Sequence, residues 1–295
     1  MKNWLVAARL RTLPLAVAGI LLGAIPLETG PSAGLIPISL CIITAILLQV
    51  LSNFANDLGD TQNGADLHRT IGPARAVQSG AISVSSMKRA VGITASMAIV
   101  SGLALIWLTL WQEGWRLSFF LFLLMGLSGV AAAYFYTAGK RPYGYSAGGD
   151  WAVFIFFGGV AVMGAHFLLY HAFHWGTFYL AVMQGMLSVM VLHLNNMRDL
   201  EDDKRSRKTT VAILLGWKWS KIYLACMLLL SAGSLCLFVA ESKQWKNVSA
   251  LLLWLVLTGV FIRVVKAKDG QDVDKELKKV ALSAFIVSLL LFLLS

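Results

Sequence analysis

Residues 34–60, with the sequence GLIPISLCIITAILLQVLSNFANDLGD, decide how this chain folds. The apolar part, 34–55, is long enough to cross a bilayer as a helix, which takes about 20 residues. Where this run ends, the chain places Asn53, Asn56, Asp57 and Asp60. If the helix continues through them, Asp57 and Asp60 project from one face, because residues three or four apart share a helix face. The stretch therefore predicts a membrane-spanning helix that carries two carboxylates to the membrane surface.

A second polar cluster follows another apolar run, 175–194, and contains Asn195, Asn196, Arg198, Asp199, Asp202 and Asp203. Asp199 and Asp203 are four residues apart, so a continuing helix would place them on one face together with Asn196. Asp202 remains an alternative to Asp203. The two helix ends form a weak internal repeat, since each is followed by a polar, basic loop. Two related halves would place the clusters opposite each other across a central cavity.

The composition of the whole chain indicates the same class of protein. It is 58% apolar and 14% charged, with a mean hydropathy of +0.72, which is typical of a multi-spanning helical membrane protein. We expect an all-α polytopic protein of about nine transmembrane helices around a central cavity, in a single domain over residues 1–295. The charged segment 263–279 is expected to be a solvated connector. The expected spans are 13–28, 34–55, 90–111, 117–137, 151–170, 175–194, 222–240, 248–266 and 279–294.

The basic residues predict how the chain is oriented in the membrane. An odd number of spans places the two termini on opposite sides. With the N-terminus in the cytoplasm, all of the 25 Lys and Arg residues except Arg116, Lys243 and Lys246 fall in cytoplasmic segments, as the positive-inside rule requires. Both acidic clusters then face the cytoplasm, where three basic loops would cap the cavity. The net charge of +10 is thus a topology signal, and no nucleic-acid partner is expected.

The clusters predict a particular chemistry. Carboxylates and amides without nearby Cys or His are hard oxygen ligands that suit Mg²⁺. Beside Arg and Lys at a membrane surface, they suggest a site for a metal-bound diphosphate, whose departure as a leaving group the metal would assist. The apolar bundle below suits a polyprenyl tail. Aromatic rings at the mouth would stabilise an allylic cation, and the candidates are Tyr134, Tyr136, Phe156 and Phe157.

The sequence resembles a known family, the UbiA superfamily of membrane prenyltransferases. The likeness rests on two aspartate clusters at the ends of spans two and six, on nine spans, and on a Tyr-x-x-x-Lys-Arg element at 136–141. It covers residues 1 to about 216 well, and beyond them only hydrophobic spans match. The matching segments are 8–16 (ARLRTLPLA), 51–60 (LSNFANDLGD), 69–75 (RTIGPAR), 141–145 (RPYGY), 149–154 (GDWAVF) and 195–203 (NNMRDLEDD).

The resemblance implies roles for individual residues. The catalytic and metal-binding carboxylates would be those of Asp57, Asp60, Asp199 and Asp203, with Mg²⁺ as the cofactor. Substrate and diphosphate contacts would come from Asn53, Arg69, Arg75, Tyr136, Lys140, Arg141, Asn196 and Arg198, with Arg11 as a weaker candidate. Lys140 and Arg141 are equally well explained as topology charges. Arg141 and Tyr145 are candidates for holding the carboxylate of the acceptor, and no general base is identified.

One difference from the family's aspartate pattern indicates which branch of the family the sequence resembles most. The branch that prenylates 4-hydroxybenzoate carries a third acid four residues after the second, but here that position is Gly64 and the next acid is Asp66. The likeness is therefore greatest to the branch that acts on 1,4-dihydroxy-2-naphthoate. It implies transfer of a polyprenyl group from polyprenyl diphosphate to that acceptor, with loss of CO₂ and diphosphate, in menaquinone biosynthesis at the bacterial cytoplasmic (inner) membrane. The alternatives are another aromatic acceptor such as 4-hydroxybenzoate and, more remotely, an ion-coupled transporter, which would carry its ionisable residues near the bilayer midplane.

Overall fold

The protein is described by a computed structural model that covers residues 2–27, 33–64, 72, 75–139, 142–206, 208–243 and 245–295. These residues are helical apart from loops and one isolated bridge between Ser146 and Thr209. The elements are α1 (Lys2–Ala7), η1 (Leu10–Thr12), α2 (Leu13–Gly23), α3 (Leu35–Gln62), α4 (Val84–Ile106), η2 (Trp107–Trp111), α5 (Arg116–Phe135), η3 (Tyr143–Tyr145), α6 (Gly149–Val153), η4 (Phe154–Gly164), α7 (Ala165–Tyr170), α8 (Trp175–Arg198), α9 (Leu200–Arg205), α10 (Val211–Ser242), η5 (Trp245–Leu252), α11 (Leu253–Lys266) and α12 (Gly270–Leu294).

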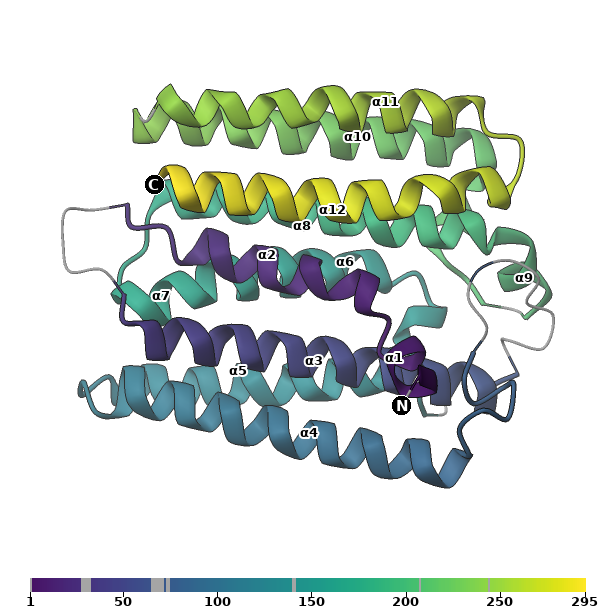
Figure 1. The fold of residues 1–295 in the computed structure, drawn as a ribbon, viewed down its shortest axis with the longest axis horizontal. Coiled ribbons are helices and arrows are strands. Elements are labelled where there is room, and N and C mark those ends of the chain that lie inside the picture. The colour runs from purple at the N-terminus through teal and green to yellow at the C-terminus, as the bar shows by residue number, and fades with distance from the viewer. Residues whose placement is uncertain are drawn as a thin grey trace.

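Nine helical segments within the described residues are long and apolar enough to span a membrane, which confirms the predicted class and number. They lie side by side along the long axis of the molecule, with α10 and α11 at one edge and α4 at the other (Figure 1). The N- and C-termini lie at opposite ends of this bundle, and α1 and α9 share one end (Figure 1). The odd number of spans accounts for the separated termini.

Helix α8 lies inside the bundle and packs against α10, η4 and α12. From Leu180 to Arg198 its buried residues recur on all sides of the helix, as expected for a segment with no lipid-facing surface, whereas Trp175 and Phe178 in the first turn are exposed. Small residues permit the close approach of η4, because a Cβ at Gly158 would lie 2.5 Å from the backbone oxygen of Ala181. Gly185 accommodates the Phe154 ring in the same way. This packing fixes the wall that η4 and α8 contribute to the interior.

Helix α5 shows the opposite pattern. Phe119 is its only buried residue, while Leu117 and Leu124 expose 74% and 67% of their surface. Leucines exposed to this degree along a 20-residue helix are suited to contact with lipid chains. The bundle therefore presents an apolar exterior on the α5 side.

The helix ends differ from the predictions at two places that matter for the site. Helix α3 continues through Asp60, as predicted, but α8 ends at Arg198 because Asp199 leaves the helical conformation, and α9 begins at Leu200. The backbone N–H of Asp203 still donates to the Asp199 carbonyl at 2.8 Å, so one helical turn links the two acids across the break. The expected connector at 263–279 is wrong, since α11 and α12 extend into it and leave only residues 267–269 between them.

Candidate functional site

A cavity of about 380 Å³ lies between the helices and joins a polar end to an apolar end. Asn56, Asp60, Arg75, Asn196 and Lys208 line the polar end. The opposite end is lined by apolar residues, among them Ile20, Cys41, Ile106 and Leu168. Along α3 the distance from Cys41 to Asp60 is about 28 Å at 1.5 Å per residue, close to the thickness of the hydrocarbon core. One cavity therefore connects a charged mouth with an apolar shaft that runs nearly the height of the bundle.

Asp60 is the carboxylate of the first cluster that lines the cavity. It is 3% exposed, and Arg75 Nη2 donates to its Oδ2 at 3.0 Å. The Tyr145 hydroxyl donates to Oδ1 at 2.8 Å. Both carboxylate oxygens are thus oriented by partners from other segments. The predicted role of Tyr145 at the acceptor carboxylate stays a prediction, while its hydroxyl is bound to Asp60 here.

Asp57 does not belong to the cavity lining and has a different environment. Its Oδ2 accepts from the backbone N–H of Ala76 at 3.0 Å, and its Oδ1 accepts from the N–H of Val77 at 3.2 Å. Asp57 therefore anchors the turn that begins with Arg75. Asn53 and Asn56 both line the cavity, and Asn53 Nδ2 donates to the Ala8 carbonyl at 2.8 Å.

The second cluster is organised around Arg198. Its Nε and Nη2 each donate to one carboxylate oxygen of Asp199 at 2.6 Å, and its Nη1 donates to Asp274 on α12 at 3.0 Å. The Arg198 side chain is only 1% exposed, so this is a buried guanidinium shared by two carboxylates. The diphosphate contact predicted for Arg198 stays a prediction. Neither Arg198 nor Asp199 is among the residues lining the cavity, whereas Asn196 is.

Asp203 faces Lys208, whose Nζ lies 3.6 Å from its Oδ1. Burial raises the pKa of Asp203 to about 6; Lys208 opposes this rise, and the negative charges of Asp199 and Asp60 add to it. Asp203 of the second cluster is therefore close enough to Asp60 of the first for their charges to interact, while the relation between the two halves of the chain stays a prediction. Among the described residues, Asp203 Oδ2 is buried without a hydrogen-bond partner. Neither Asp202 nor Asp203 is among the residues that line the cavity, but Lys208 is, and its contact with Asp203 favours Asp203 over Asp202 as the acid near the site.

The loops at the mouth bring these groups together. The backbone N–H of Ala147 donates to the Thr209 carbonyl at 2.8 Å, and the N–H of Thr209 donates to the Tyr145 carbonyl at 3.1 Å. This pairing holds the Lys208 ammonium 5.3 Å from the centre of the Tyr145 ring. Two loops far apart in the sequence therefore form part of the cap.

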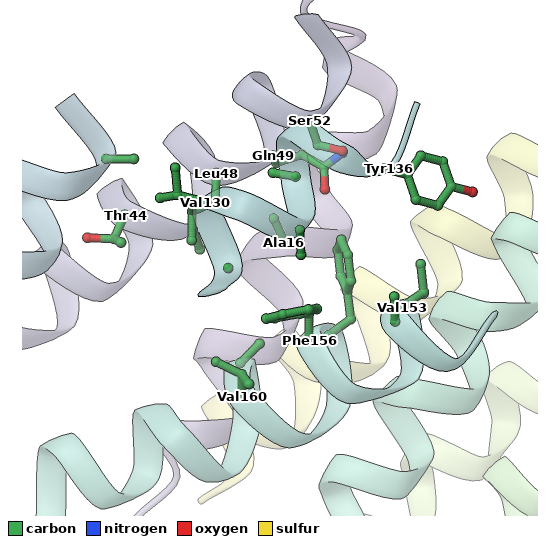
Figure 2. A pocket seen from close by; sticks show the side chains of 18 of the residues that line it. Ala16, Thr44, Leu48, Gln49, Ser52, Val130, Tyr136, Val153, Phe156 and Val160 are labelled. Carbon is green, nitrogen blue, oxygen red and sulfur yellow. The ribbon is translucent and has the colours of Figure 1, made fainter. Parts of the chain in front are cut away.

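Tyr136 lies at the edge of the cavity, with its hydroxyl turned away from Gln49 and Ser52 (Figure 2). A Cβ at Gly149 would lie 2.9 Å from this hydroxyl, so the glycine makes room for it. Burial raises the pKa of Tyr136, and the charges of Asp150, Asp60 and Asp203 raise it further. Tyr136 is therefore a neutral phenol placed beside the acidic groups. Of the other predicted aromatic residues, Phe156 and Phe157 line the cavity.

Several predicted residues lie outside the described part of the chain. These are Arg69, Lys140 and Arg141 from the predicted contacts, together with Asp66. Other residues were missed by the sequence reasoning. Lys208 was not singled out because it ends a basic run, 204–208, in which no spacing distinguishes one cation from another. Arg9 lies two residues before Arg11, which was only a weak candidate, and both line the cavity.

No three His, Cys, Asp or Glu side chains within the described residues converge closely enough to hold a metal ion by themselves. This arrangement still suits Mg²⁺, which proteins commonly bind through one or two carboxylates while substrate phosphates and water supply the remaining ligands. The buried Oδ2 of Asp203 and the mutual repulsion of Asp60, Asp199 and Asp203 are the features that a cation would relieve. The donor set thus fits a divalent cation that binds together with a phosphate-bearing ligand.

Comparisons with known proteins agree with this geometry. The model of the UbiA prenyltransferase family matches residues 13–289. The chain is 36% identical to the 1,4-dihydroxy-2-naphthoate octaprenyltransferase of Haemophilus influenzae, over 98% of this chain and 94% of that protein. It is 38% identical to the protein of the same name from Escherichia coli, over 95% of this chain and 87% of the relative.

Solved structures show the same fold. A UbiA homologue from Archaeoglobus fulgidus bound to GPP and Mg²⁺ superimposes with a TM-score of 0.68 at 16% identity, covering 99% of both chains. A homologue from Aeropyrum pernix without ligand superimposes with a TM-score of 0.66, covering 95% of this chain and 94% of the other. The fold, the family match and the full-length relatives all agree. The chain belongs to the UbiA prenyltransferase family.

Proposed function

We propose that this protein transfers a polyprenyl group from polyprenyl diphosphate to 1,4-dihydroxy-2-naphthoate, with loss of CO₂ and diphosphate, and so produces a demethylmenaquinol for menaquinone synthesis. The observation that carries the proposal is the single cavity that joins Asp60, Arg75 and Lys208 to an apolar shaft. That cavity suits a substrate with an anionic head and a long hydrocarbon tail. The near full-length relatives named for this acceptor support the choice of substrate.

The proposed cofactor is Mg²⁺, supported by the UbiA homologue structures that hold DMAPP or GPP together with Mg²⁺. Asp60 and Asp203 would hold the ion, with Asp199 and Asp57 as the remaining predicted ligands. When bound, Mg²⁺ would stabilise the negative charge that develops on the departing diphosphate. A cation at Asp60 would also release Arg75 from that carboxylate, and Arg75 and Lys208 would then bind phosphate oxygens.

Aromatic residues of the cavity wall would contact the allylic carbon of the prenyl group. With the diphosphate at the mouth, the allylic carbon points into the shaft, where the faces of Phe156 and Phe157 are available to stabilise positive charge. The C–O bond to diphosphate breaks, and a C–C bond forms to the ring carbon that bears the carboxylate. The C–C bond to that carboxylate then breaks, and its electron pair restores the aromatic ring as CO₂ leaves. No ring proton is removed, so this substitution needs no general base at the ring carbon.

The distribution of charge and the bacterial relatives support an orientation and a location for the protein. We propose that the N-terminus and the cavity mouth face the cytoplasm, because Lys and Arg concentrate at that end of the bundle. The relatives from Haemophilus influenzae and Escherichia coli support a bacterial inner membrane. A transporter is disfavoured, since the carboxylates lie at one end of the cavity rather than at the bilayer midplane.

The test is a two-acceptor assay on purified protein with Mg²⁺ and a polyprenyl diphosphate. With 1,4-dihydroxy-2-naphthoate we expect equimolar release of CO₂ and diphosphate and a prenylated naphthalenediol, detected by mass spectrometry. Chelation of the metal with EDTA should stop the reaction, and added Mg²⁺ should restore it. Turnover of 4-hydroxybenzoate without turnover of the naphthoate would contradict the acceptor assignment and leave the prenyl transfer intact.

A further inference from the structure

The face of α3 that lines the cavity stays polar well below the mouth. Below Asp60 it presents Asn56, Asn53, Ser52 and Gln49. At 1.5 Å per residue, Ser52 and Gln49 lie about 12 and 16 Å from Asp60 along the helix axis. A polyprenyl chain can neither donate nor accept a hydrogen bond, so its passage does not account for polar groups at this depth. The stripe indicates that a polar part of a second ligand lies here.

The two members of the stripe nearer the mouth are bound within the protein. Asn53 Nδ2 donates to the Ala8 carbonyl at 2.8 Å and to Thr12 Oγ1 at 3.1 Å. Asn56 Oδ1 accepts from the Thr137 hydroxyl at 3.0 Å. These amides therefore tie α3 to the N-terminal segment and to the end of α5.

The two deeper members present polar atoms to the cavity. Gln49 Nε2 donates to Thr12 Oγ1 at 3.2 Å and to Asn53 Oδ1 at 3.4 Å, which fixes the amide plane. Within the described residues nothing donates to Gln49 Oε1, and the Ser52 hydroxyl has no hydrogen-bond partner. Both side chains extend from α3 into the pocket, on the side opposite Phe156 (Figure 2). The Ser52 hydroxyl and the Gln49 carbonyl oxygen therefore face the interior together, and both can still form a hydrogen bond with a ligand.

The opposite wall suits a flat ring. Phe156 comes from η4 and lies across the pocket from Gln49 (Figure 2). Its ring reaches α5, where a Cβ at Gly129 would lie 3.6 Å from it. Ala16 and Val153 add small apolar surfaces to the same lining (Figure 2). A polar pair on one side and an aromatic ring on the other match a hydroxylated aromatic molecule.

We infer that Ser52 and Gln49 bind a hydroxyl group of the aromatic acceptor, whose ring packs against Phe156. The inference rests on the proposed function and extends it to the recognition of the acceptor. The phenolic O–H donates to Gln49 Oε1, and its oxygen accepts from the Ser52 hydroxyl. The hydroxyl in question is the one at position 4, because the carboxylate at position 2 belongs beside cations of the cavity lining such as Arg9 and Arg11, and the 4-hydroxyl is the ring substituent farthest from it.

This arrangement makes the 4-hydroxyl a determinant of specificity. An acceptor without it leaves Gln49 Oε1 and the Ser52 hydroxyl unpaired in a site closed by the ligand, and buried polar groups without partners are costly. We therefore expect the protein to prefer 1,4-dihydroxy-2-naphthoate over 1-hydroxy-2-naphthoate by roughly tenfold in Kd, the factor that 1.4 kcal/mol produces.

The experiment measures equilibrium binding of these two naphthoates to the full-length protein in detergent, with Mg²⁺ and inorganic diphosphate present. Gln49→Met and Ser52→Ala should each weaken binding of the dihydroxy compound and leave that of the monohydroxy compound nearly unchanged, so that the preference falls toward one. Ser128→Ala is the matched control, because its hydroxyl lies on the exposed face of α5 and bonds to Met125. The control variant should keep the wild-type preference for the dihydroxy compound over the monohydroxy compound.

The possible outcomes distinguish a failure of this inference from a failure of the proposed function. A wild type that binds the dihydroxy compound, with the same preference in both variants, overturns the assignment of Ser52 and Gln49 and leaves the proposed function standing. A wild type that binds neither naphthoate contradicts the proposed function and this inference together. Equal weakening of both naphthoates would also overturn the inference, since it indicates a general change of the cavity shape and not the loss of one hydroxyl contact.

Discussion

The charged residues at the mouth form pairs, and this pairing shapes how the site can bind an anion. Arg75 is bound to Asp60, Lys208 lies against Asp203, and Arg198 is bound to Asp199. A basic side chain that is already paired with a carboxylate attracts a phosphate group less strongly than an unpaired basic side chain does. A divalent ion at the carboxylates would replace the basic side chains there and release them for the diphosphate. The residue contacts thus explain why metal and diphosphate should bind together.

Asp57 and Asp60 are expected to differ when each is changed to asparagine. Asp60→Asn removes a cavity carboxylate and should lower kcat by about 100-fold or more. It should lower the unfolding temperature less than Asp57→Asn does, because the Tyr145 hydroxyl can accept from the new amide N–H₂ while Arg75 still donates to the amide oxygen. Asp57→Asn should lower the unfolding temperature as well, because the new amide N–H₂ would face the backbone N–H donors of Ala76 and Val77. Assays of turnover and thermal unfolding on the same preparations check both. Equal effects of the two changes on both measurements would contradict the division of roles.

At the scale of the helices, the spans and the two clusters could be predicted, because a run of about 20 apolar residues is a strong signal and the acids stand where the runs end. Contacts between distant segments could not be predicted. Tyr145 bonds to Asp60 across 85 residues, and Arg198 bonds to Asp274 across 76. No spacing in the sequence encodes such pairs. The break at Asp199 was missed as well, because the bonds of Arg198 to Asp199 and to Asp274 on α12 cannot be read from the spacing of residues in the sequence.

Helix α12 is expected to depend on Asp274. Asp274→Asn would leave the buried Arg198 guanidinium with Asp199 as its remaining charged hydrogen-bond acceptor and should destabilise the protein by about 1–3 kcal/mol. Asp272→Asn is the control on the same helix, because its pair with Lys275 is exposed to solvent and should contribute little to stability. Denaturant-induced unfolding in detergent measures both. Equal stability of the two variants would show that the contact with α12 does not hold the second cluster.

Helix α3 approaches the end of α5 through Gly59. A Cβ there would lie 2.6 Å from the backbone carbon and oxygen of Thr137, so Gly59→Ala must push the two segments apart and should cost about 1–3 kcal/mol. Gly92→Ala, on α4, meets nothing within 4 Å and should be neutral or slightly stabilising. Thermal unfolding of the two variants gives the comparison. Unchanged stability of Gly59→Ala would indicate that this approach is looser than the structure shows.

At the scale of the whole molecule, charge is concentrated at one end of the bundle and the cavity opens there. Single cysteines in an otherwise cysteine-free protein test which side of the membrane this end faces. Ser79→Cys lies in an exposed turn at the mouth end, and Gln112→Cys lies in the exposed turn at the other end. In intact cells, an impermeant thiol reagent should label Gln112→Cys and spare Ser79→Cys, which should react once the cells are opened. The reverse pattern would invert the proposed orientation.

The depth of the cavity predicts how chain length is accommodated. Ala45 and Gly102 line the shaft from α3 and α4, and Ala45 lies about 22 Å from Asp60 along the axis. A phenylalanine at position 45 would obstruct the lower shaft but leave the mouth and the acceptor wall unchanged. Ala45→Phe should therefore keep turnover of geranyl diphosphate, whose two-unit chain is short, and lower turnover of long polyprenyl diphosphates more than about tenfold through a higher KM. Ala104→Phe is the control, because Ala104 is exposed on the outside of α4 and does not line the cavity. Equal loss with short and long substrates would mean that the tail does not follow this shaft.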